Sequence, residues 1–156
     1  MSKNRLISEI LKRSVSPTWD LAKLEWQLIE IYETEDPDEC LCGHNPIMEI
    51  CVLQHRQNKT NVIVGNTCVN KFLGYPTDSI FQALKRVKVD VQKSFNRDAI
   101  SFAFEKKWIN EWENKFYLDI IDKRILTDKQ IKKKRQINDR LMLKFKINPN
   151  VKTLKI

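Results

Sequence analysis

The side chains best suited to metal chemistry all lie in one stretch of 29 residues. It contains every cysteine and every histidine of the chain: Cys40, Cys42, His44, Cys51, His55 and Cys68. Zinc in proteins is held by four ligands in a tetrahedron, most often cysteine thiolates and sometimes histidine. The clustering therefore predicts one structural zinc ion as the cofactor of this chain.

The spacing of the cysteines indicates how they would meet. Cys40 and Cys42 are alternate residues followed by Gly43, which permits a tight turn whose backbone N–H groups can hydrogen-bond to the thiolates. Cys68 is expected near the start of a helix, where the helix dipole favours a thiolate. We predict ligation by Cys40, Cys42, Cys51 and Cys68. His44 is the alternative to Cys51, because a strand can direct that thiol into the core.

Three other interpretations of these residues are weaker. Ordinary buried cysteines would seldom cluster so closely. A disulfide framework is disfavoured because the chain shows no secretory signal pattern and Cys40 and Cys42 are poorly spaced for bridging. A catalytic pair of Cys68 with a histidine lacks an orienting third group and an oxyanion motif. Four thiolates leave no open position for an activated water, so we expect neither enzymatic activity nor a small-molecule substrate.

His55 is expected to be a surface residue of a strand.

Composition and charge narrow the class of protein. The chain has 156 residues, of which 42% are hydrophobic and only three are glycine, which favours one domain with a small appendage. No apolar run approaches the roughly 20 residues of a membrane span, and we expect a cytoplasmic protein. The formal net charge of +8 favours a polyanionic partner, DNA or RNA.

The first half of the chain carries the patterns of a small α+β unit. Apolar residues at helical spacing predict a helix at 3–13, and Ser16-Pro17 predicts the start of a second at 17–24. Strand-forming residues follow, with an acidic loop at 33–39 between the first two strands. The expected strands are 25–33, 47–55 and 61–65, and a helix begins near Cys68. A knuckle, a hairpin and a helix in this order are typical of a treble-clef-like finger.

The second half is expected to be helical. Apolar stripes and capping residues predict four helices. The first spans 78–94 and the second begins after Asn96. The third begins at a capping box, Asn110–Glu113, and the fourth spans 128–145 after a second capping box, Thr127–Gln130. Trp112, Phe116 and Ile131 are assigned to the core. The predicted fold is α+β, a zinc-bound β-hairpin finger packed on a mainly helical bundle. Its parts are N-terminal helices (1–24), the finger (25–75) and a basic helical region (76–156), forming one compact unit overall.

Two groups of cations are candidates for phosphate contacts. They are Arg56, Lys59 and Lys71 near the finger, and Lys132, Lys133, Lys134 and Arg135 in the last helix. Adjacent like charges destabilise a helix, and a phosphate backbone would relieve that repulsion. A merely solvated helix end explains the second group about as well. The rival function is a protein-interaction module that binds or inhibits a host factor, and a third is a subunit of a larger assembly.

The cysteine stretch also resembles a known group of proteins. The pattern from Cys40-x-Cys42-Gly-His-x-Pro-Ile to Cys51, followed by Val64-Gly65-Asn-x-Cys68, is similar to small zinc-finger proteins of phages and bacterial mobile elements. The similarity extends over roughly residues 24–140, with weaker pieces at Trp112–Tyr117 and Lys123–Gln130. It implies that all four cysteines are ligands and that the chain comes from a mobile element. Members of this group are mostly of unassigned function, so the resemblance implies no activity.

Overall fold

The computed structural model describes residues 2–148, so the end of the predicted basic region, 149–156, lies outside the described part. The chain divides into two compact units, with the boundary between Asp78 and Ser79. The described residues form one three-stranded antiparallel sheet and seven α-helices, which confirms the α+β class. Within this range no helix has both the length and the apolar character needed to cross a membrane.

The sheet of the first unit has the strand order β1-β2-β3. Its strands are β1 (Trp26–Asp38), β2 (Ile47–His55) and β3 (Asn61–Gly65). The second and third have the predicted bounds, because a polar turn separates two strongly apolar runs. The first is longer than predicted: the acidic segment assigned to a loop continues the strand. Its pairing with β2 is irregular after Glu33 and resumes where Asp38 lies opposite Ile47.

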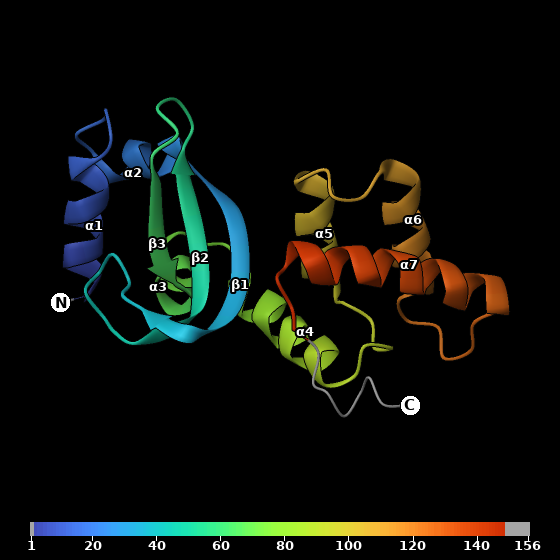
Figure 1. The fold of residues 1–156 in the computed structure, drawn as a ribbon. Helices are drawn as coiled ribbons and strands as arrows, with labels where there is room; N and C mark the ends of the chain where they lie inside the picture. The colour runs from blue at the N-terminus through green and yellow to red at the C-terminus, as the bar shows by residue number, and fades with distance from the viewer. Residues whose placement is uncertain (1, 149–156) are drawn as a thin grey trace. The chain divides into compact units, whose positions relative to one another are not determined.

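Three helices and a short 3-10 turn complete the first unit. The N-terminal part contains α1 (Ser2–Lys12), α2 (Trp19–Ala22) and the 3-10 turn Lys23–Glu25, and α3 (Asn66–Phe72) follows the sheet. In Figure 1, α1 lies beside β3, and it buries Leu6 and Ile10 completely. Because α3 starts directly after β3, Cys68 lies in its first turn.

The second unit is helical, as predicted. It contains α4 (Thr77–Val89, whose first two residues precede the unit boundary), α5 (Arg97–Glu105), α6 (Glu111–Ile120) and α7 (Asp128–Lys144). Asn96 caps α5 through the N–H of Ala99. Both predicted capping boxes, Asn110–Glu113 and Thr127–Gln130, are formed, which fixes where α6 and α7 begin.

An aromatic cluster forms the core where α7 crosses α5 (Figure 1). The Phe145 ring contacts those of Phe95, Phe102 and Trp108. Two core assignments from the sequence were wrong. Trp112 is 59% exposed and Ile131 is 46% exposed, because the apolar stripes of α6 and α7 are wider than the surface that their neighbours cover.

Candidate metal centre and cationic pocket

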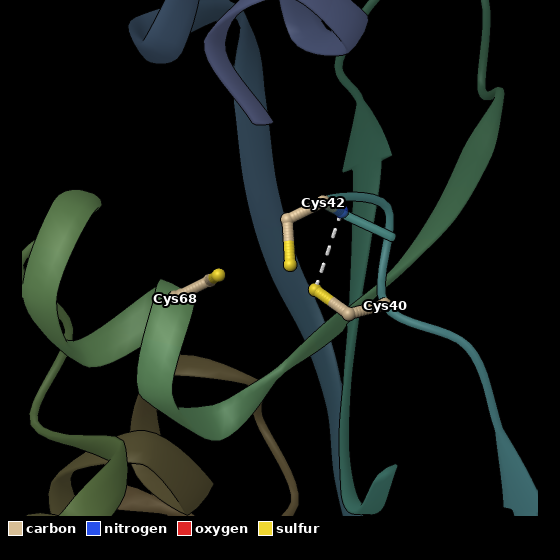
Figure 2. A group of neighbouring side chains, drawn as sticks. All are labelled: Cys40, Cys42 and Cys68. Atoms are coloured by element: carbon tan, nitrogen blue, oxygen red, sulfur yellow. Dashed lines mark hydrogen bonds between the residues drawn. The ribbon is translucent and has the colours of Figure 1, made fainter. Parts of the chain in front are cut away.

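Three of the four cysteines meet inside the first unit. The sulfur atoms of Cys40, Cys42 and Cys68 all lie within 4.8 Å of one another, and all three residues are buried. Figure 2 shows the first two thiols on the loop between β1 and β2 and the third on α3, with their sulfur atoms converging. None of the cysteines forms a disulfide. The fold therefore brings residues 28 positions apart in sequence into one soft-ligand cluster that could hold a metal ion.

Backbone N–H groups surround the sulfur of Cys40. The N–H of Gly65 donates to Cys40 Sγ at 3.2 Å, and that of Cys42 does so at 3.5 Å. A hydrogen bond from the Cys68 thiol, followed by these backbone donors, lowers the pKa of Cys40, although burial opposes this. The same hydrogen bond raises the pKa of Cys68, which keeps its proton as the donor. Metal-bound thiolates are commonly supported by hydrogen bonds from surrounding groups, and the backbone N–H donors around Cys40 provide such support.

The turn that carries Cys40 and Cys42 depends on Gly43. Its N–H donates to the carbonyl of Cys40 at 2.7 Å, and its φ of +93° lies in the region that favours glycine. The guanidinium of Arg5, on α1, packs against it so closely that a Cβ at this position would lie 2.1 Å from Nη1. The predicted role of Gly43 in a tight turn is thus confirmed.

Cys51 does not belong to this sulfur cluster. It lies in the middle of β2, opposite Ile31 and Val64, and is completely buried. Burial raises the pKa of its thiol. His44 is exposed on the loop after Cys42, and its carbonyl accepts from the N–H of Cys40 at 2.9 Å.

His55 has a different role from the one predicted. It is only 1% exposed, so its assignment to the surface was wrong. Its Nε2 lies 2.7 Å from Glu25 Oε1, and the N–H groups of Gln57 and Asn58 donate to Nδ1. Both ring nitrogens are therefore engaged, which leaves none for a metal.

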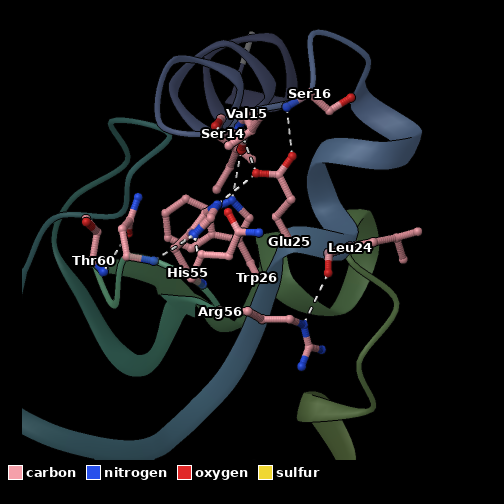
Figure 3. Close-up of polar contacts among 12 residues, drawn as sticks. Ser14, Val15, Ser16, Leu24, Glu25, Trp26, His55, Arg56 and Thr60 are labelled. Atoms are coloured by element: carbon pink, nitrogen blue, oxygen red, sulfur yellow. Dashed lines mark hydrogen bonds and ion pairs between the residues drawn. The ribbon is translucent and has the colours of Figure 1, made fainter.

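The carboxylate of Glu25 ties this histidine to the N-terminal helices (Figure 3). It accepts from the N–H groups of Val15 and Ser16 at 2.7 and 2.8 Å. Hydrogen bonds from Val15, His55 and Ser16, in that order, lower the pKa of Glu25. The Trp26 indole contacts the His55 ring edge-on and donates to Ser14 Oγ. The buried histidine is therefore part of a structural network.

The two predicted groups of cations lie in different units. Arg56, Lys59 and Lys71 are exposed in the first, and Arg56 Nε donates to the carbonyl of Leu24. The second group lies on α7, which contains seven lysines and arginines but only two aspartates. Within residues 2–148, four of these cations have no hydrogen-bond or ion-pair partner: Lys129, Lys132, Arg135 and Lys144.

The other cations of α7 have internal partners. Glu113, buried in α6, pairs with Arg140 at 2.8 Å and lies 3.6 Å from Lys133. The hydrogen bond from Arg140 is the main cause that lowers the pKa of Glu113. Lys133 also lies over the Trp112 ring, 5.4 Å from its centroid. Of the predicted set on α7, Lys132 and Arg135 are therefore the ones available to an external anion.

A pocket of about 340 Å³ lies beside α7 in the second unit. Arg124 contributes to it from the loop before α7, and Lys134 and Arg135 from the helix itself. The Nζ of Lys134 donates to the carbonyl of Gln92 at 3.2 Å, and burial lowers its pKa. Sequence reasoning missed this pocket, because Arg124 and Gln92 meet α7 only through tertiary packing.

Comparison with protein-family models, curated proteins and solved structures gave no significant match to this chain. The assignment of function therefore rests on the residues and their geometry.

Proposed function

We propose that the chain is a nucleic-acid-binding protein whose first unit is stabilised by one structural zinc ion. The converging sulfur atoms of Cys40, Cys42 and Cys68 carry the metal part of this proposal. A tetrahedral zinc site with Zn–S bonds of about 2.3 Å separates its sulfurs by roughly 3.8 Å. Sulfur atoms already within 4.8 Å of one another need only small movements to bind the ion. Thiolate-rich sites of this kind favour zinc over the oxygen-seeking cations.

His44 is the best candidate for the fourth ligand. It follows Cys42 by two residues, and its exposed side chain has freedom to turn toward the cluster. Cys51 is held inside the sheet, and both nitrogens of His55 are engaged. Three cysteines and one histidine form a closed structural site. Such an ion would hold the β1–β2 loop against α3.

The cationic surface of α7 supports nucleic acid as the partner. Lys129, Lys132, Arg135 and Lys144 lack internal partners within the described chain, so their charges are available to phosphates. Neutralising phosphates releases condensed counterions, which drives binding and makes it sensitive to salt. The exposed cations Arg56, Lys59 and Lys71 would add contacts from the first unit.

Fluorescence anisotropy across a salt series tests this function. We expect zinc-loaded protein to bind oligonucleotides with an affinity that falls steeply with salt. The triple variant Lys129→Gln, Lys132→Gln, Lys144→Gln should reduce the slope of log K against log salt by up to about 2–3, at roughly 0.7–0.9 per lost contact. Lys115→Gln, an exposed lysine of α6, is the control for a change of charge elsewhere.

Weak, salt-insensitive binding to every DNA and RNA probe would contradict the nucleic-acid function. Co-purification of one host protein in stoichiometric amount, even after nuclease treatment, would then favour the protein-interaction module. The phage or mobile-element origin stays a prediction from the resemblance of the cysteine pattern.

A further inference from the structure

The pocket beside α7 combines a cationic rim with an apolar wall. Arg124, Lys134 and Arg135 supply three positive charges around it. The guanidinium groups of Arg124 and Arg135 have no carboxylate partner among residues 2–148. Burial lowers the pKa of Lys134, and the negative charge of Asp90 partly opposes this shift. An anion in the pocket would therefore meet two guanidinium groups that form no ion pair with a carboxylate of the described residues.

The apolar wall consists of Val91, Leu126 and Ile131. Ile131 is 46% exposed, although its spacing on α7 matches the apolar stripe. Its place in the pocket explains this, because one side of the helix faces the cavity instead of the core. A ligand with a flat apolar body and a negative group would satisfy both the wall and the rim.

A buried hydrogen-bond network holds the floor of the pocket in place. Asn138 Nδ2 donates to the carbonyl of Lys93 at 3.0 Å, and its Oδ1 accepts from the Tyr117 hydroxyl at 2.7 Å. Tyr117 in turn accepts from the N–H of Phe95. The segment after α4 is thus fixed against α6 and α7, so the cavity is formed before any ligand arrives.

We propose that this pocket receives one unstacked nucleotide of a bound single strand. The base would lie against Val91, Leu126 and Ile131, and the adjoining phosphate would be held by Arg124 and Arg135. The volume of about 340 Å³ falls within the range of pockets that hold small organic groups. Bases of a single strand can be splayed out into such sites, whereas bases in a duplex are stacked and paired. The inference rests on the proposed nucleic-acid function and assigns a preference for single strands.

Anisotropy with a fluorescent oligothymidylate and a duplex of equal length tests the pocket. The variant Arg124→Gln, Arg135→Gln should lose about tenfold or more in affinity for the single strand. Its loss for the duplex should match that of Lys129→Gln, Lys132→Gln, which removes two cations of α7 that do not line the pocket. Ile131→Trp fills the cavity without changing the charge. It should weaken single-strand binding severalfold and leave the salt slope unchanged, and melting curves verify that each variant is folded.

The outcomes separate the pocket from the wider function. Nucleic-acid binding would stand but the pocket would be overturned by three results together: equal affinity of the wild type for both probes, Arg124→Gln, Arg135→Gln behaving like Lys129→Gln, Lys132→Gln, and Ile131→Trp behaving like the wild type. Absence of salt-sensitive binding to either polymer would defeat the proposed function itself. Binding of thymidine 5′-monophosphate at the pocket, without affinity for either polymer, would also overturn the proposal in favour of a free nucleotide.

Discussion

The hydroxyl of Tyr117 donates a hydrogen bond to Asn138 Oδ1 across 2.7 Å in the interior of the second unit. The phenol oxygen of Tyr117 also accepts from the N–H of Phe95 at 2.9 Å, so this one side chain connects three segments of the chain. Burial raises the pKa of Tyr117 to about 12, and the phenol therefore remains a donor at neutral pH.

Tyr117→Phe should destabilise the second unit by about 1–3 kcal/mol, because it leaves a buried donor and a buried acceptor without partners. Chemical denaturation measures the loss. Amide exchange localises it, since the Phe95 N–H should exchange faster while distant amides of the first unit keep their protection. Unchanged exchange at Phe95 would show that the phenol does not fix this segment.

Gly43→Ala should weaken metal binding, and Gly74→Ala provides a matched control. Both glycines have positive φ, so alanine costs about 1 kcal/mol of backbone strain at either position. Only at Gly43 does the added Cβ meet another residue, the Arg5 guanidinium. Competition with a zinc chelator should show a lower zinc affinity for Gly43→Ala alone. Equal zinc affinities in the two variants would show that the conformation of the Gly43 turn does not contribute to metal binding.

Acid should destabilise the first unit partly through Glu25. Its pKa is lowered in the folded state, so the unfolded chain takes up the proton first as the pH falls. The stabilisation is fully present above the ordinary glutamate pKa and is lost as pH falls through the folded value. Glu25→Gln should therefore flatten the dependence of unfolding free energy on pH in the acid range. Glu35→Gln, at an exposed site of β1, is the control and should follow the wild type. Parallel curves for Glu25→Gln and the wild type would contradict this account.

Cobalt substitution distinguishes the candidates for the fourth ligand. Co²⁺ bound to three thiolates and one imidazole should give tetrahedral d–d bands that shift in His44→Ala. Cys51→Ala should retain the wild-type spectrum, because its thiol lies outside the sulfur cluster. A spectrum altered by Cys51→Ala and not by His44→Ala would restore the four-cysteine set.

The parts of the fold that depend on local patterns were predictable from the sequence. The bounds of β2 and β3 follow from two apolar runs around a polar turn, and Asn110 and Thr127 mark helix starts by their own side chains. Tertiary relationships were not visible in this way. The partner of His55 is Glu25, 30 residues earlier in the chain, and no periodicity connects the two.

The candidate metal site shows the same division. The Cys-x-Cys-Gly pattern predicted the pairing of Cys40 with Cys42, and the position of Cys68 near a helix start predicted its approach. Whether Cys51 points toward the cluster depends on the register of β2 in the sheet, which the spacing of the cysteines does not determine. The pocket beside α7 likewise depends on how separate segments pack.

The most direct test of the central claim is the metal content of the purified chain by native mass spectrometry. We expect one zinc ion per chain, retained in Cys51→Ala and lost in Cys68→Ser, with a lower melting temperature of the first unit in the latter. Structural zinc contributes on the order of 10 kcal/mol to the folding free energy of small fingers, so its loss should lower the melting temperature clearly. A metal-free wild type that does not take up added zinc, and a Cys68→Ser variant with unchanged melting, would contradict the account.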